Sequence, residues 1–110
     1  MRTIASHSDF ERVFSRGYRL NHPLMRMVIC RLDDEGAPGR VAFAAAKRLG
    51  CAPRRNRAKR VMRACARNLG FPVQGFDVIL FATRATGSAS QADLTSALTS
   101  LCGRAGMHAH

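Results

Sequence analysis

The sequence predicts an α+β protein in which one small β-sheet packs against helices. Its 110 residues fit one domain, and a 46% share of apolar residues suffices for a hydrophobic core. The spacing of the apolar residues also changes along the chain, giving the order helix, two or three strands, helix, strand, helix. We therefore expect a single domain over residues 1–110, with an ordered core over about residues 6–102 and a frayed tail over 103–110.

The first helix is predicted to begin at a serine near the N-terminus. Ser8 and Glu11 have the spacing of a capping box, in which the serine side chain caps the helix. Phe10 and Phe14 follow one helical turn apart and share a face. Gly17 is expected to end the helix. Two phenylalanines on so short a helix must be buried against another element, and core packing is the simplest role for them.

Two strands are predicted by alternation of apolar residues, over residues 24–32 and 40–47. In the first strand Arg26 interrupts one apolar face and Arg31 interrupts the other, which indicates that one edge of the strand meets water. In the second strand one face carries only alanine: Ala42, Ala44 and Ala46. Such a shallow face suits either a closely docked helix or the floor of a groove, and the sequence favours neither.

The segment from Lys47 to Arg67 contains nine of the 18 Lys and Arg residues, and no acidic residue occurs between Gly36 and Phe76. Pro53 suits the first turn of a helix. Apolar residues then recur with helical spacing and predict a buried stripe: Ala58, Val61, Met62, Cys65, Ala66 and Leu69. The opposite side is cationic and carries Asn56, Lys59, Arg60, Arg63 and Arg67, with Arg57 on its flank.

This one-sided charge indicates a polyanionic partner. The formal net charge of the chain is +11. Solvated helix faces normally mix charges of both signs, and like charges one turn apart repel by a few tenths of a kcal/mol. A phosphate backbone would offset that repulsion and release its counterions. A bare solvated face is the weaker alternative.

The C-terminal part is predicted to contain one strand and one helix. Residues 77–83 contain a continuous apolar run over 78–82, which is typical of a strand buried on both faces. Ser90 or Asp93 is expected to cap the last helix, and Gly103 and Gly106 are expected to end it.

The four cysteines do not have the spacing of a metal site. They lie 21, 14 and 37 residues apart, and the histidines add no close pair. We expect four reduced thiols, at least two of them in the core, and no metal ligands: Cys30, Cys51, Cys65 and Cys102. No run of about 18 apolar residues and no signal peptide is apparent, so a cytoplasmic protein is expected.

Three segments resemble the bacterial ribonuclease P protein component. Residues 47–60, KRLGCAPRRNRAKR, are similar to the family signature K-[KR]-x-G-x-A-x-x-R-N-R-x-K-R. Residues 10–17 resemble its F-x-x-V-F-x-x-G helix, and residues 77–82 resemble its D-x-[VI]-[VI]-x-A strand. The three segments occur in the family's order and span nearly the whole chain, which makes the resemblance specific.

The resemblance implies an α-β-β-β-α-β-α order, like that of the ribosomal S5 domain-2 fold. It also implies the protein subunit of ribonuclease P, which acts with a large catalytic RNA to remove the 5′ leader of precursor tRNA. The RNA would hold the active site and its Mg²⁺ ions, so no catalytic residue, metal ligand or protein partner is expected. A cleft between the first helix and the sheet would bind the leader through Phe10, Phe14, Lys47 and Arg48. The catalytic RNA would be contacted by Arg55, Asn56, Arg57, Lys59, Arg60, Arg63 and Arg67.

Three other functions compete with this one. A general or ribosomal RNA-binding protein would share the charge but not the three segments. A self-sufficient nuclease would need clustered carboxylates or a general base, whereas the seven acidic residues are scattered along the chain. A membrane-surface protein would need a larger apolar stripe than the cationic helix has.

Overall fold

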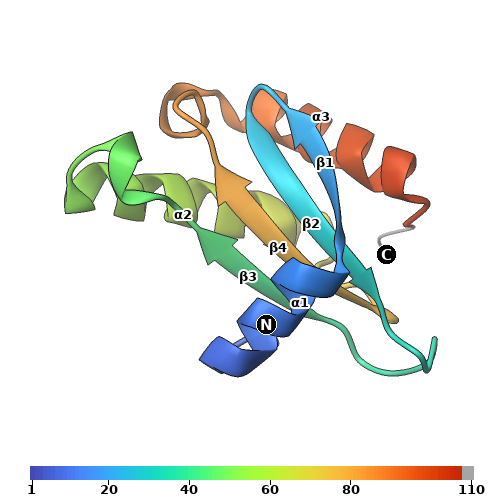
Figure 1. Cartoon of the computed structure of the whole chain (residues 1–110). Helices are drawn as coiled ribbons and strands as arrows, with labels where there is room; N and C mark the ends of the chain where they lie inside the picture. Colours follow the sequence, from blue (N-terminus) through green and yellow to red (C-terminus); the bar gives the residue numbers. More distant parts are fainter. Residues whose placement is uncertain (108–110) are drawn as a thin grey trace.

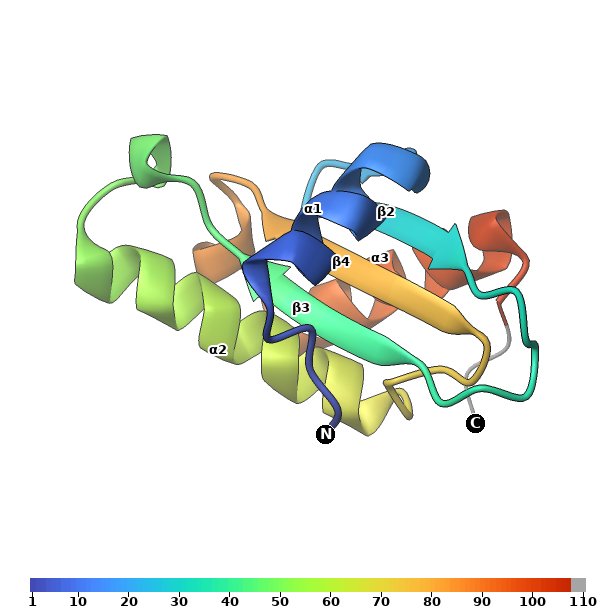
Figure 2. The ribbon, with the colours of Figure 1, turned by 60° about the horizontal axis from the view of Figure 1, so that its bottom comes forward.

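The computed structural model describes residues 1–107 and has the predicted α+β order (Figure 1). One sheet carries a single helix on one face and two helices on the other (Figure 2). Two single-turn 3₁₀ helices, η1 and η2, occur in the loops. The elements are α1 (His7–Arg16), β1 (Tyr18–His22), β2 (Met25–Arg31), β3 (Arg40–Ala44), η1 (Lys47–Leu49), α2 (Ala52–Asn68), β4 (Phe76–Ala82), η2 (Thr86–Ser88) and α3 (Gln91–Ala105).

The sheet is mixed, with the strand order β1-β2-β4-β3. The β1–β2 and β2–β4 pairs are antiparallel, and β3 runs parallel to β4 because α2 connects them. The register places Asn21, Arg26, Phe81 and Ala44 side by side in a row across one face. This row is central to the candidate site, since it joins all four strands.

The hydrophobic core has two parts, one on each face of the sheet. Under α2 and α3, the predicted apolar face of β2 is fully buried at Met25, Met27 and Ile29. Under α1 a smaller cluster contains Ile4, Val13, Val28, Ala42 and Ile79. The alternation predicted for β2 is therefore confirmed, and in β3 Val41 and Ala42 are buried on opposite faces of the sheet. The second predicted strand ends at Ala44, before its predicted end at Lys47, because η1 begins at Lys47.

The N-terminal segment closes the free edge of β3. The Ile4 amide donates to the carbonyl oxygen of Val41 at 3.1 Å, and the Val41 amide donates to that of Arg2 at 3.1 Å. Figure 2 shows this segment running beside β3 before it enters α1. Since α1 follows directly, this pairing fixes the point at which the helix crosses onto the sheet.

The start and end of α1 differ from the prediction. The N-cap is Ser6, whose hydroxyl accepts from the Asp9 amide at 3.2 Å, so the capping spacing begins two residues before Ser8. Gly17 follows the helix as predicted, but its φ of −73° needs no glycine. Close packing requires the glycine instead, because a Cβ there would lie 2.7 Å from a methyl group of Val28 and from the carbonyl oxygen of Val13.

The C-terminal boundary also lies beyond the prediction. Ser90 caps α3, its hydroxyl accepting from the Asp93 amide at 3.1 Å. Gly103 lies within the helix, which ends at Gly106 in the left-handed conformation with φ of +74°. Met107 is only 2% exposed, so the packed core extends past residue 102 and includes the first part of the expected tail. Residues 108–110 lie outside the described part of the chain.

Candidate nucleic-acid interface

A cluster of three aromatic rings lies where α1 crosses the sheet. Phe10 and Phe14 of α1 meet Phe81 of β4 edge to face, with ring centroids 6.2 and 5.9 Å apart. The rings of Phe10 and Phe14 lie nearly parallel, 6.5 Å apart. Both are half-buried, so each ring supports the packing of α1 and leaves part of its surface open.

Beside this cluster the sheet is hollowed by about 290 Å³. The walls include two residues of the predicted leader cleft, Phe14 and Arg48, whereas Phe10 and Lys47 do not line the hollow. The predicted alanine face is divided between a docked helix and a groove floor, because β3 ends at Ala44 and Ala46 lies beyond it. Ala42 is buried in the cluster beneath α1, and Ala46 reaches the hollow.

Three arginines line the hollow: Arg19, Arg26 and Arg48. The guanidinium carbon of Arg19 lies 4.5 Å from the centroid of the Phe14 ring, in cation–π contact. Arg26 extends from the row that contains Phe81. An aromatic wall beside several guanidinium groups is suited to a nucleic-acid strand, because rings stack on bases and arginine pairs with phosphates.

Two further hollows continue this surface toward the start of α2. One, of about 600 Å³, shares Arg26 and Arg48 with the first and adds Arg84. The next, of about 370 Å³, shares Arg84 and lies against the N-terminal turns of α2. Among the described residues, no carboxylate lines any of the three hollows. Together they form what we call the cationic groove, which the described chain lines with seven arginines: Arg19, Arg26, Arg48, Arg54, Arg55, Arg57 and Arg84.

The cationic side of α2 is exposed beyond this groove. Arg60, Arg63 and Arg67 are exposed, and Lys59 is half-buried. Within residues 1–107, none of the α2 cations lies within ion-pair distance of a carboxylate. Asn56 is also exposed, so this side offers both charge and hydrogen bonds to a partner.

Two members of the predicted α2 set also have roles within the protein. The Arg57 Nε donates to the Gly87 carbonyl oxygen at 3.0 Å, which ties α2 to η2. Arg63 lies over the Phe43 ring, with its guanidinium carbon 5.2 Å from the ring centroid. The Nε of Arg55 is buried and has no hydrogen-bond partner among residues 1–107. These three side chains are therefore more restricted than Arg60 and Lys59.

Sequence reasoning assigned no site role to five residues of the groove: Arg19, Arg26, Arg54, Arg84 and Phe81. Arg19 lies on β1, a strand that the alternation did not resolve, and Phe81 is hidden in the apolar run of β4. Arg84 follows β4 in the loop before η2 and carries no motif of its own. Arg26 was detectable, because an arginine that interrupts an otherwise apolar strand face marks the part of the sheet that meets water.

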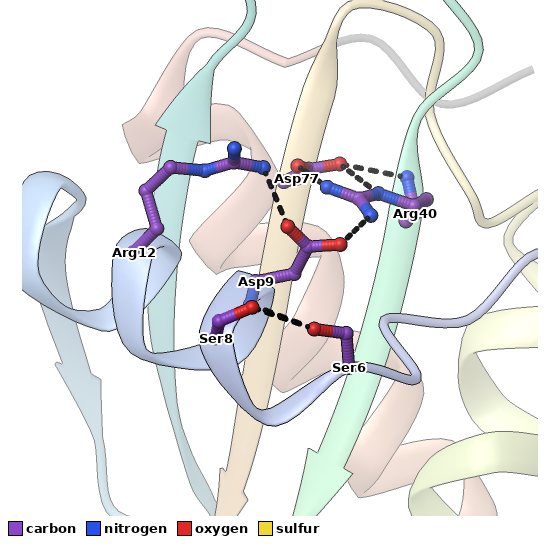
Figure 3. A network of polar contacts seen from close by, with 6 residues as sticks. All are labelled: Ser6, Ser8, Asp9, Arg12, Arg40 and Asp77. Carbon is purple, nitrogen blue, oxygen red and sulfur yellow. Dashed lines mark hydrogen bonds and ion pairs between the residues drawn. The ribbon is translucent and has the colours of Figure 1, made fainter.

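A polar network anchors the start of α1 on the sheet (Figure 3). Two nitrogens of the Arg40 guanidinium donate to Asp77, at 2.8 and 3.3 Å, and the third donates to Asp9 at 2.8 Å. The Arg40 amide also donates to Asp77, at 3.1 Å, and Arg12 pairs with the other oxygen of Asp9 at 3.1 Å. Asp77 is 1% exposed, so a buried carboxylate fixes the arginine that reaches α1.

The contacts in this network shift the pKa values of Arg40 and Asp9 in the expected directions. The hydrogen bonds that Arg40 donates to Asp77 and then to Asp9 raise the pKa of Arg40. The hydrogen bond from Arg40, opposed in part by burial, lowers the pKa of Asp9. The ion pair is therefore present throughout the neutral pH range.

The cysteines form no disulfide within residues 1–107, and Cys65 and Cys102 lie in the core as predicted. Burial raises the pKa of Cys65, and burial together with the nearby Cys65 raises that of Cys102 to about 11. The described residues bring no three His, Cys, Asp or Glu side chains together as a metal site. They also contain no helix long and apolar enough to cross a membrane.

The family model described as Ribonuclease P matches residues 1–106. The chain belongs to the ribonuclease P protein family. The ribonuclease P protein component of Symbiobacterium thermophilum is 31% identical over 94% of this chain and 90% of its own length. That of Clostridium botulinum strain Loch Maree is 28% identical over 96% of this chain and 95% of its own.

Solved structures agree on the fold. The RNase P protein of Staphylococcus aureus superimposes with a TM-score of 0.81, at 20% identity and 98% coverage of both chains. That of Thermotoga maritima gives a TM-score of 0.78, at 19% identity, with 94% of this chain and 97% of its own covered. The arrangement of one four-stranded sheet and three helices is thus shared across sequences that have diverged widely.

Proposed function

We propose that this chain is the protein subunit of ribonuclease P, binding the catalytic RNA and the 5′ leader of precursor tRNA so that the leader is removed and the tRNA 5′ end matures. One observation carries the proposal. A chain that matches the family over residues 1–106 also has a groove with seven arginines, no carboxylate and an aromatic wall. That surface has the chemistry of a single-strand binding site.

The leader is assigned to the part of the cationic groove beside α1. Phe14 and Phe81 offer ring surface for stacking, and Arg19, Arg26 and Arg48 pair with phosphates. Stacking and charge tolerate any base, as a subunit that serves many precursor tRNAs requires. Phe10 acts by packing against Phe14 and Phe81, and Lys47 adds charge at the exposed turn before α2.

The catalytic RNA is assigned to the cationic side of α2. The exposed cations there have no carboxylate partner in the described chain, so an RNA backbone would supply their counter-charge. The contact set is Arg55, Asn56, Arg57, Lys59, Arg60, Arg63 and Arg67.

Catalysis is assigned to the RNA, with no protein residue in a catalytic role. Mg²⁺ would supply charge stabilisation of the cleavage step in the holoenzyme, and we assign these ions to the RNA. The described residues do not fit such an ion, since no three carboxylate, histidine or cysteine side chains converge. We therefore assign no metal-dependent step to the residues of this chain. Its unpaired thiols suit the reducing cytoplasm, where we place the holoenzyme.

Reconstitution with a bacterial ribonuclease P RNA tests this proposal. At limiting Mg²⁺, adding the protein should accelerate removal of the leader from precursor tRNA. The double variant Arg60→Gln/Arg63→Gln should weaken assembly with the RNA while leaving the apolar stripe of α2 intact. Acceleration equal to that given by an unrelated basic protein would instead favour a general or ribosomal RNA-binding role. Cleavage by the pure protein without RNA, abolished by a point mutation, would overturn the assignment of catalysis.

A further inference from the structure

We infer that Arg40 is a positioning residue. Through Asp9 it holds α1 in place over the sheet, and it thereby fixes the position of Phe14 in the part of the cationic groove that is assigned to the leader. The inference deepens the proposed function and rests on its assignment of the leader to that groove. It concerns a residue outside the groove, because Arg40 lines none of the three hollows.

The first step is that α1 depends on few interactions. A helix of 10 residues is marginal on its own, and Val13 is the one residue of α1 that is buried. Phe10 and Phe14 are half-buried and must keep surface open to bind a base. Within residues 1–107, the bond between Arg40 and Asp9 is the only side-chain hydrogen bond that joins α1 to the sheet.

The second step is that Arg40 is itself rigidly held. Asp77 is buried and accepts from the Arg40 amide, Nε and a terminal nitrogen, so both oxygens of this carboxylate are engaged. The remaining terminal nitrogen is directed at Asp9, as Figure 3 shows. One planar guanidinium therefore binds both Asp77 on β4 and Asp9 on α1, and this fixes the position of α1 relative to β4. A lysine could not do so with the same geometry, because it lacks the rigid planar arrangement of donors.

The third step is the distance between the anchor and the groove. Arg40 and Asp77 are neighbours in register, and Phe81 lies four residues farther along β4, roughly 13 Å away. Asp9 is in the first turn of α1, and Phe14 is more than one turn later, at the groove. The anchor and the aromatic wall thus lie at opposite ends of one short helix, so releasing the first lets the second move.

Asp9→Ala is the informative variant, because it breaks the link to α1 and leaves the bonds between Arg40 and Asp77 intact. Glu11→Ala is the matched control. It removes the same charge from the same helix, but the Glu11 side chain is exposed and within residues 1–107 its one ion pair is with His7 of the same helix, at 3.8 Å. Asp9→Glu keeps the carboxylate and serves as the conservative variant. Arg40→Ala is avoided, since it would leave Asp77 buried without its partner.

Two measurements are made on each variant. Hydrogen exchange on the free protein compares the amides of α1 with those of α2. Binding of the reconstituted holoenzyme compares precursor tRNA with mature tRNA, which has no leader. For Asp9→Ala we expect faster exchange confined to α1 and a loss of leader-dependent affinity of about two- to fivefold, as for a half-exposed ion pair. Glu11→Ala should leave both unchanged, and Asp9→Glu should restore at least part of each.

Each other outcome overturns a definite part of the inference. Unchanged exchange in α1 of Asp9→Ala would show that the ion pair does not hold the helix. Faster exchange with an unchanged preference for precursor tRNA would show that the position of α1 does not set leader binding. If the wild-type holoenzyme shows no preference for precursor tRNA at all, the leader assignment fails, whereas the exchange result still decides the anchoring role of Arg40.

Discussion

Truncating Phe14 should separate its contribution to folding from its contribution to leader binding. The ring is half-buried against Phe81, carries the Arg19 guanidinium on its face and lines the hollow beside α1. Phe14→Ala removes both the packing and the ring surface. Phe14→Leu keeps most of the packing and removes only the aromatic face.

The magnitudes follow from the environment of the ring. Full burial would make Phe→Ala cost about 3–5 kcal/mol of the free energy of unfolding. Since Phe14 is only half-buried, we expect a loss of about 2 kcal/mol for alanine and of about 1 kcal/mol for leucine. Stacking of one base contributes about 1–3 kcal/mol, so both variants should bind precursor tRNA roughly five- to 150-fold more weakly.

The assay pairs thermal unfolding of the free protein with binding of precursor and mature tRNA by the holoenzyme. Phe43→Leu is a close control, because Phe43 is also half-buried and carries a guanidinium, that of Arg63, 5.2 Å from its ring centroid. It lies on the opposite face of the sheet, in contact with the larger core cluster. Phe43→Leu should therefore lower stability to a similar degree and leave leader discrimination intact.

The Phe14→Leu result can refute the reasoning. If this variant lowers the melting temperature while the folded fraction retains full leader discrimination, Phe14 is a core residue and not a stacking surface. Equal losses of leader discrimination for Phe14→Leu and Phe43→Leu would likewise show that the effect is general destabilisation.

Three further predictions follow from charge and packing. The affinity of the protein for the catalytic RNA should fall with salt, and Arg60→Gln/Arg63→Gln should reduce the log–log slope by about 1.4–1.8, measured from dissociation constants over a KCl series; an unchanged slope would mean that neither arginine contacts phosphate. The pKa of Asp9 is lower in the folded chain than in the unfolded chain, so the ionised carboxylate stabilises the fold. This stabilisation is complete above the unfolded-state pKa of about 4 and is lost as the pH falls through the lower folded-state pKa. The melting-temperature difference between wild type and Asp9→Asn should thus be constant from about pH 5 to 8 and shrink below about pH 4. Gly17→Ala should lower the melting temperature and loosen α1 in hydrogen exchange, because its Cβ would lie 2.7 Å from Val28 and within 2.8 Å of two backbone oxygens; an alanine variant as stable as wild type would contradict the close packing.

The helix α2 was predictable because two independent signals coincide there. Its apolar residues recur with helical spacing, and its cations occupy the opposite side, so the buried and exposed faces both follow from the order of residues. The strand faces of β2 and β3 were predictable for the same reason. Alternation reports which side chains share a face without any knowledge of the partner strand.

The complete groove and the anchoring of α1 by Arg40 could not be predicted, because they depend on the register between strands, which no local sequence pattern contains. The strand β1 is mostly polar, and it forms because it pairs with β2. Arg40 and Asp77 are 37 residues apart and meet only because β3 and β4 lie parallel in a particular register. The start of α1 was misplaced for a local reason: Ser6 and Ser8 both offer a capping hydroxyl, and only the folded chain decides between them.

The most direct test of the central claim measures how strongly the protein makes the holoenzyme prefer precursor tRNA over mature tRNA. Affinities of both RNAs are determined for the catalytic RNA alone and for the complex, with leaders shortened one nucleotide at a time. We predict that the protein strengthens binding of precursor tRNA selectively, and that the gain disappears once the leader no longer reaches the cationic groove. Equal strengthening of precursor and mature tRNA at every leader length would contradict the account.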